Sequence, residues 1–110
     1  MANYEGLNDG LRWLVKARDG YRCRWCGRTN VPTDCHHIRY RRSVLDDVAE
    51  NLVSLCRHCH SFVHGVPTKQ KDMIEKHEAQ EILFALIDMP AATGLALRRQ
   101  LKRAREVESA

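Results

Sequence analysis

The sequence predicts a small α+β domain built around metal ligands, and three observations lead to this fold class. Leucines recur at helical spacing near both ends of the chain, short apolar runs between them are typical of strands, and two Cys-x2-Cys pairs flank those runs. With 110 residues and 44% apolar content, the chain suits one domain with a modest core. We therefore expect residues 1–110 to form a single domain to whose stability a bound metal contributes.

The N-terminal part predicts a helix followed by a metal-binding turn. Apolar residues from Leu7 to Leu14 recur at helical spacing, which predicts a helix over residues 7–18. Residues 21–27 predict a short strand that leads into a tight turn, where Gly27 permits the positive φ that such a turn needs.

The central block predicts a strand, a loop, a second strand and a short helix. The strands are expected over residues 35–40 and 52–55, separated by an acidic loop over residues 41–50. Residues 58–65 have room for about two helical turns, which Gly65 ends.

The last third predicts two further helices. The first is expected over residues 69–88 and must end before Pro90, and the second over residues 95–107. We thus divide the single domain into a core over residues 18–65 and a helical C-terminal appendage over residues 66–110. The residues expected to face inward from the first of these helices are Met73, Ile74, His77, Leu83 and Ile87.

Positive charge is concentrated in two zones although the net charge is only +4. Arginines crowd around the cysteines and histidines, and the run from Arg98 to Arg105 contains no acid. Both zones suit a polyanion such as nucleic acid, although a merely soluble surface explains the charge alone equally well. The sequence has no apolar run of signal-peptide or membrane-spanning length, so we expect a cytoplasmic protein without a membrane partner.

The cysteines predict a structural zinc site. In a reducing compartment, Cys-x2-Cys pairs are interpreted as metal ligands or redox pairs in preference to structural disulfides. Two such pairs supply four soft thiolates for tetrahedral Zn2+ with no open position, whereas a redox pair needs no second copy. The fifth cysteine, Cys35, is expected to be buried in a strand; a redox sensor would instead need it exposed with a low pKa. The expected zinc ligands are Cys23, Cys26, Cys56 and Cys59.

The histidines require a separate explanation, because four thiolates already satisfy one zinc ion. His60 and His64 are four residues apart on the expected helix, so they share a face as a pair of metal ligands would. His36 and His37 are neighbours on an expected strand and point to opposite faces, so one can bind metal while the other acts separately. An imidazole of ordinary pKa is a good general base at physiological pH. Any single one of the four could instead be an ordinary packed or surface histidine.

Residues 18–65 resemble the HNH endonucleases, a group of nucleases with a ββα-metal, or His-Me, finger. Five elements carry the resemblance, and they occur in the family's order: Cys23-x2-Cys26-Gly27, then His36-His37-Ile38, then Asn51-Leu52, then Leu55-Cys56-Arg57-His58-Cys59-His60, and finally His64.

The resemblance implies roles for individual residues. His37 would be the general base that activates the attacking water, and His36 and His60 would bind a catalytic divalent ion, with His64 as a third ligand. Asn51 would fix the loop between the strands through hydrogen bonds from its side-chain amide to the backbone. A set of imidazole ligands should favour Mn2+, Co2+, Ni2+ or Zn2+ relative to Mg2+, which prefers oxygen ligands.

The implied substrate is DNA, nicked or cleaved with weak sequence specificity by a monomer or homodimer. Arg39, Arg41 and Arg42 follow the expected base and are placed to hold neighbouring phosphates. The competing hypothesis is a non-catalytic, zinc-stabilised DNA-binding module, which binds without cleaving. The C-terminal run is expected to contact phosphates through Arg98, Arg99, Lys102, Arg103 and Arg105. The alternative is that Leu95, Leu97 and Leu101 dock this helix on the core or on a second subunit, and that the charges only keep it soluble.

Overall fold

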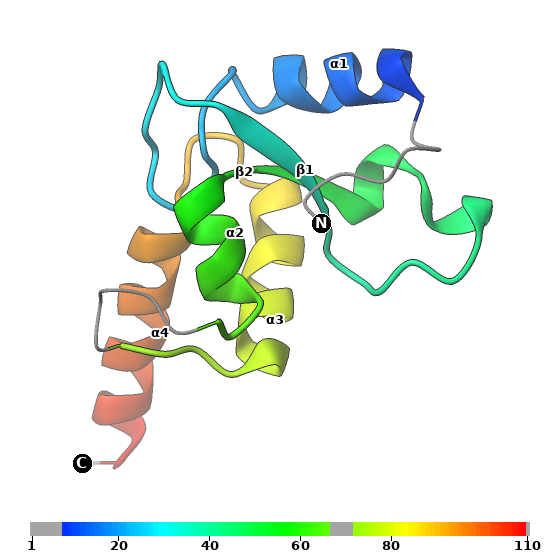
Figure 1. Cartoon of the computed structure of the whole chain (residues 1–110). Coiled ribbons are helices and arrows are strands. Elements are labelled where there is room, and N and C mark those ends of the chain that lie inside the picture. The colour runs from blue at the N-terminus through cyan, green and yellow to red at the C-terminus, as the bar shows by residue number, and fades with distance from the viewer. Residues whose placement is uncertain (1–7, 67–71, 110) are drawn as a thin grey trace.

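The computed structural model describes residues 8–66 and 72–109, which form an α+β fold (Figure 1). A two-stranded antiparallel sheet lies at the centre with helices on both faces, so the fold class expected from the sequence is confirmed. No helix in the described ranges is long and apolar enough to cross a membrane. The helices are α1 (Asp9–Arg18), α2 (Arg57–Val63), α3 (Lys76–Ile87) and α4 (Gly94–Ser109), and the strands are β1 (Thr33–His37) and β2 (Leu52–Cys56).

The register of the sheet decides which side chains reach which face. His36 lies opposite Val53 of β2, and His37 lies opposite Leu52. Leu52 packs with Val15 of α1, whereas Val53 belongs to the larger apolar cluster that α2 and α3 complete on the other face. Because side chains alternate along a strand, the two neighbouring histidines point to opposite sides of the sheet, as expected from the sequence.

A buried ion network holds the end of α1 to the rest of the fold. The Asp19 carboxylate accepts hydrogen bonds from Arg18 Nε at 2.8 Å, Arg24 Nη1 at 3.3 Å and the Ser54 backbone N–H at 2.8 Å. Burying charge is costly unless the charge is paired and hydrogen-bonded, and both conditions are met here. Arg24 ties the network to the C-terminal end of α3 by donating to the carbonyl oxygens of Leu86, Met89 and Ala92.

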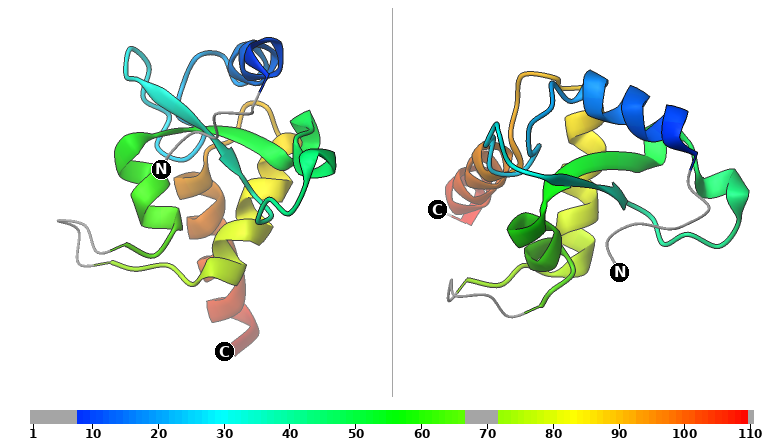
Figure 2. Two further views of the ribbon diagram at one scale, coloured as in Figure 1. Left: turned by 45° about the vertical axis from the view of Figure 1, so that its right-hand side comes forward. Right: turned by 45° about the horizontal axis from the view of Figure 1, so that its top comes forward.

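Helix α4 begins against the turn that carries Cys23 and Cys26. The Gly94 N–H donates to the Arg24 carbonyl oxygen at 2.9 Å, and the Leu95 N–H donates to the Trp25 carbonyl oxygen at 3.0 Å. These bonds satisfy two of the N–H groups that a helix N-terminus otherwise leaves unpaired. The rest of α4 extends away from the sheet (Figure 2). Helix α4 is therefore joined to the core at its start and projects from the core at its end.

The helix predicted over residues 69–88 is shorter in the structure. It begins at Lys76; residues 72–75 are not helical, and residues 67–71 lie outside the described residues. Arg98 donates to the Met73 carbonyl oxygen at 3.2 Å and holds this segment against α4. Met73 and His77 are consequently exposed rather than inward-facing, whereas Ile74 and Leu83 are buried as expected.

Two smaller differences concern the segments around the strands. Residues 21–27, predicted as a short strand that leads into a tight turn, form the turn, but the strand is reduced to a single bridge between Arg22 and Thr29. The predicted loop over residues 41–50 contains two short 3-10 turns, Val44–Asp46 and Ala49–Asn51.

Candidate metal centres and active site

Four cysteine side chains converge between the turn after α1 and the junction of β2 with α2. Their sulfur atoms all lie within 4.8 Å of one another, and Cys26 Sγ and Cys56 Sγ are 4.0 Å apart. A Zn–S distance of about 2.3 Å places tetrahedral sulfurs roughly 3.8 Å apart, so the cluster has the dimensions of a closed zinc site. The four cysteines that could hold zinc are Cys23, Cys26, Cys56 and Cys59, and none of them forms a disulfide.

The backbone around the cysteines is shaped for this convergence. Gly27 has a φ of +81°, and its N–H donates to the Cys23 carbonyl oxygen at 2.9 Å, which closes the first turn. A hydrogen bond from Cys59 lowers the pKa of Cys23 to about 4, so one thiolate is favoured within the cluster. A thiolate is the form of cysteine that binds metal, so the cluster fits a soft divalent ion.

A second cluster gathers three histidines on the α2 side of the sheet. His36 comes from β1, His60 from α2, and His64 from the residue that caps α2. Their nearest ring nitrogens lie within 4.8 Å of one another, and His60 Nε2 is 3.0 Å from His64 Nε2. Imidazoles bind a metal through a neutral ring nitrogen, so three converging rings can hold one divalent ion.

Burial keeps two of these histidines, His36 and His64, in the neutral form. Removal from water, reinforced by the neighbouring imidazoles, lowers the pKa of His36 to about 3. Burial also lowers the pKa of His64, although that ring lies at the solvent-facing edge of the cluster. Both rings therefore remain uncharged at neutral pH, which is the protonation state that an ion requires.

Asp34 orients one of the three rings. Its Oδ2 atom lies 3.2 Å from His60 Nδ1 at a buried position, two residues before His36 on the same face of β1. A carboxylate at Nδ1 favours the tautomer that carries its proton there, which leaves Nε2 as the ligand atom. Carboxylate contacts of this kind fix the direction and raise the basicity of a metal-binding imidazole.

His37 has a separate partner on the opposite side of its strand. Its Nε2 lies 2.8 Å from Asp47 Oδ1, and the same carboxylate accepts two hydrogen bonds from Arg41, at 2.8 Å and 3.1 Å. The Arg41 hydrogen bond lowers the pKa of Asp47, so this carboxylate stays charged at neutral pH. The charged carboxylate favours the His37 tautomer with its proton on Nε2, which leaves the lone pair on Nδ1.

Asn51 fixes the loop that follows His37. Its side-chain oxygen accepts from the Arg39 N–H at 2.8 Å, and its amide nitrogen donates to the carbonyl oxygens of Arg39 at 3.3 Å and Asp46 at 3.0 Å. The residue is 1% exposed, so water does not compete for these bonds. Asn51 thus holds both ends of the loop against the start of β2.

Residues 23–65 match the family model described as HNH endonuclease. This segment is an HNH endonuclease domain. The match contains both clusters, His37 and Asn51, and the resemblance expected from the sequence is confirmed. Comparison of the chain with curated proteins and with solved structures finds no match.

Two acidic residues of the HNH domain were missed by the sequence reasoning. Asp34 could have been found from alternation, because residues two apart on a strand share a face and His36 was already a candidate ligand. Asp47 had only a weak signal, since it lies ten residues from His37 in a loop with other acids. Each carboxylate contacts the imidazole of a candidate histidine, Asp34 that of His60 and Asp47 that of His37.

The arginines after His37 divide into two kinds. Arg39 and Arg42 are exposed at the edge of the HNH domain. Arg41 is partly buried, and its guanidinium forms an ion pair with Asp47. Arg39 and Arg42 are thus accessible to a phosphate, whereas Arg41 is placed to hold the His37 partner.

The basic run of α4 also divides. Arg98 is 7% exposed, lies over the Phe62 ring, and pairs with Asp72 and Glu78, so its charge is used within the fold. This position corrects the expectation that Arg98 is available to a phosphate. The cationic residues of the run that are exposed on the projecting part of α4 are Arg99, Lys102, Arg103 and Arg105.

Proposed function

We propose that the chain is a metal-dependent endonuclease that hydrolyses the phosphodiester bonds of DNA. The observation that carries this proposal is the pairing of a three-histidine cluster with a separately held histidine, His37, inside an HNH domain. A divalent ion bound at the cluster would polarise the phosphate and stabilise the charge that develops on the leaving 3′ oxygen. His36 and His60 would hold this ion, with His64 as a third ligand.

His37 acts as the general base in this proposal. Its Nδ1 atom takes a proton from the attacking water, and Asp47 stabilises the resulting imidazolium through Nε2. Asp47 is then a positioning residue, and Arg41 keeps its carboxylate oriented. The resulting hydroxide attacks phosphorus opposite the leaving oxygen and the bond from phosphorus to the 3′ oxygen breaks. The leaving oxygen takes a proton from solvent, so the products are a 5′ phosphate and a 3′ hydroxyl.

The remaining HNH residues position the substrate and the fold. Arg39 and Arg42 bind phosphates next to the cut by charge-assisted hydrogen bonds, and Asn51 keeps their loop in place. Zinc on the four cysteines has a structural role, because four thiolates leave no open coordination position. The all-imidazole cluster favours Mn2+, Co2+, Ni2+ or Zn2+ over Mg2+ as the catalytic ion.

A plasmid-nicking assay under single-turnover conditions tests the proposal, run with each of these divalent ions. The His37→Ala variant should keep its zinc and its affinity for DNA while the cleavage rate falls by about two to four orders of magnitude. His58→Ala provides the matched control, because His58 is an exposed histidine of α2 outside the three-histidine cluster. A parent protein that binds DNA but leaves it uncut with every ion would favour the DNA-binding module instead. Equal rates for His37→Ala and the parent would eliminate His37 as the base.

A further inference from the structure

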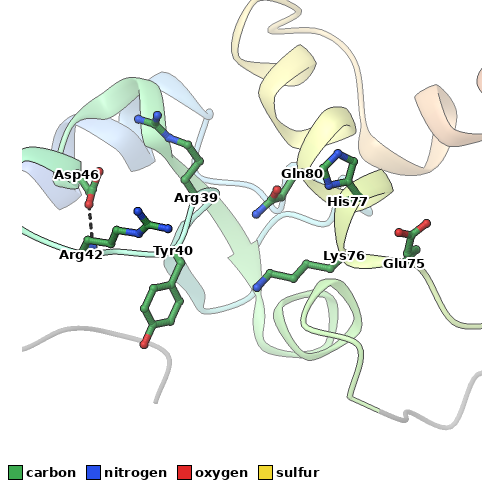
Figure 3. Close-up of a pocket in the computed structure, with 8 residues that line it drawn as sticks. All are labelled: Arg39, Tyr40, Arg42, Asp46, Glu75, Lys76, His77 and Gln80. Atoms are coloured by element: carbon green, nitrogen blue, oxygen red, sulfur yellow. Dashed lines mark hydrogen bonds between the residues drawn. The ribbon is translucent and has the colours of Figure 1, made fainter.

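A cavity of about 610 Å³ lies beside the three-histidine cluster, between the loop after β1 and the first turn of α3 (Figure 3). Arg39, Tyr40 and Arg42 line it from the loop, and Lys76 and Gln80 line it from α3. We call this cavity the Lys76 cleft. Its α3 wall lies outside residues 23–65, the segment that matches the family model.

The Lys76 cleft opens into the candidate active site. A second cavity of about 200 Å³ is lined by His36, His37 and His64, and it shares Tyr40, Lys76 and Gln80 with the Lys76 cleft. Figure 3 shows Lys76 reaching from α3 toward Tyr40, and both of these residues line both cavities. A polymer held over the histidines would therefore continue between these two side chains.

Both walls of the cleft are held in place. Gln80 Nε2 donates to the Ile38 carbonyl oxygen at 3.1 Å, which joins α3 to the residue after His37. The opposite wall is held by Asn51 through both backbone polar groups of Arg39. The separation between Lys76 and the loop is therefore fixed by hydrogen bonds rather than by the long side chains alone.

The charges in the cleft suit one phosphodiester group. Arg39, Arg42 and Lys76 face two carboxylates, Asp46 and Glu75. Asp46 is already occupied, since it accepts from the backbone N–H groups of Arg42 at 2.7 Å and Ser43 at 3.2 Å. Within residues 8–66 and 72–109, the Lys76 ammonium has no ion-pair partner.

Tyr40 adds an apolar element to this cationic wall. Its side chain is 72% exposed although it lines both cavities. An exposed aromatic ring beside cationic side chains is the combination that proteins use to stack bases while neighbouring charges bind phosphates.

We propose that the Lys76 cleft binds the phosphodiester group next to the scissile one in a DNA strand, with Lys76 as its main cation and Tyr40 against the adjoining nucleoside. This proposal rests on the proposed nuclease function, because it assigns the path of the same substrate. Glu75, at the N-cap of α3, opposes binding at this position.

The test measures DNA affinity in the His37→Ala background, so that cleavage does not disturb the titration. Fluorescently labelled duplex is titrated with zinc-loaded protein at several salt concentrations. Lys76→Gln should raise the dissociation constant about three- to tenfold, as expected for an exposed charged contact, and should flatten the log-log salt slope by roughly 0.9. Glu75→Gln should lower the dissociation constant.

The matched control is Arg57→Gln, which removes an exposed cation that lines neither cavity. A Lys76→Gln effect no larger than that of Arg57→Gln would overturn the proposal, and so would a Glu75→Gln variant that binds more weakly. Failure of the nuclease function is distinguishable from failure of the cleft proposal. If the chain is not a nuclease, the parent leaves plasmid uncut, whereas the DNA affinities of the Lys76 and Glu75 variants still show whether the cleft binds DNA.

Discussion

Substitution of Gly94 by alanine should destabilise the protein through the turn that carries Cys23 and Cys26. An added Cβ at this position would lie 2.5 Å from Trp25 Cδ2, roughly 1 Å inside the ~3.5 Å contact distance of two carbon atoms. The indole is 2% exposed, and hydrogen bonds to Arg24 and Trp25 hold the helix start in place, so neither side can retreat.

The magnitude follows from two opposing effects. Overpacking a tight site costs about 1–3 kcal/mol, and the upper end applies where both partners are fixed. Replacing glycine by alanine in a helix returns at most ~1 kcal/mol. The net loss is then ~2 kcal/mol, which corresponds to a fall in Tm of roughly 8–16 °C for a domain of this size.

Thermal unfolding of the zinc-loaded protein measures this loss, and two comparisons separate its cause. Gly65→Ala is the contrasting case of strain without a clash, since Gly65 has a φ of +76° and an added Cβ there meets no atom within 4 Å, whereas Gly94 has no positive φ. It should lose only about 1–2 kcal/mol. In a double-mutant cycle, Trp25→Leu should cancel most of the Gly94→Ala effect. A Gly94→Ala protein as stable as the parent would refute the packing of α4 on the turn.

Three further predictions concern the metal sites and α4. Cys59→Ser should lose zinc and most thermal stability together, because metal binding and folding are coupled at such sites. Zinc content and Tm measure this, and a variant as stable as the parent would contradict the structural role of the four cysteines. Asp34→Ala should weaken binding of the catalytic ion about 10- to 100-fold with zinc content unchanged, as seen in the ion dependence of cleavage, and an unshifted dependence would exclude its orienting role. Arg98→Gln should lower Tm with little effect on the salt dependence of DNA binding, whereas Arg99→Gln should do the reverse; the opposite assignment would show that Arg98 meets the phosphates. The Arg98 hydrogen bond lowers the pKa of Asp72. The contribution of the Arg98–Asp72 pair to stability should therefore be complete at neutral pH and should fade as the pH falls below about 4.

The sequence was sufficient to predict the parts of the site that depend on local periodicity. Alternation along a strand separated His36 from His37, and helical spacing joined His60 to His64. These predictions succeeded because each depends on residues within one element.

Contacts between distant segments were not predictable in this way. Arg98 belongs to a basic run that a helical pattern places in solvent, yet its partners Asp72 and Glu78 lie 20 or more residues earlier in the chain. The start of α3 was misplaced for a related reason, since tertiary contacts with Arg98 hold residues 72–73 outside the helix. Local propensity carries no information about such partners.

The central claim is that an ion on the histidine cluster is required for hydrolysis, and the dependence of cleavage rate on ion concentration tests it most directly. The zinc-loaded parent and His60→Ala are compared under single-turnover conditions, with the favoured ion titrated into each. The rate of the parent should saturate with added ion, and His60→Ala should require about 10- to 100-fold more ion or reach no measurable rate, while its zinc content stays at the parental value. A parental rate that does not depend on added ion, or a His60→Ala curve that superimposes on that of the parent, would contradict the account.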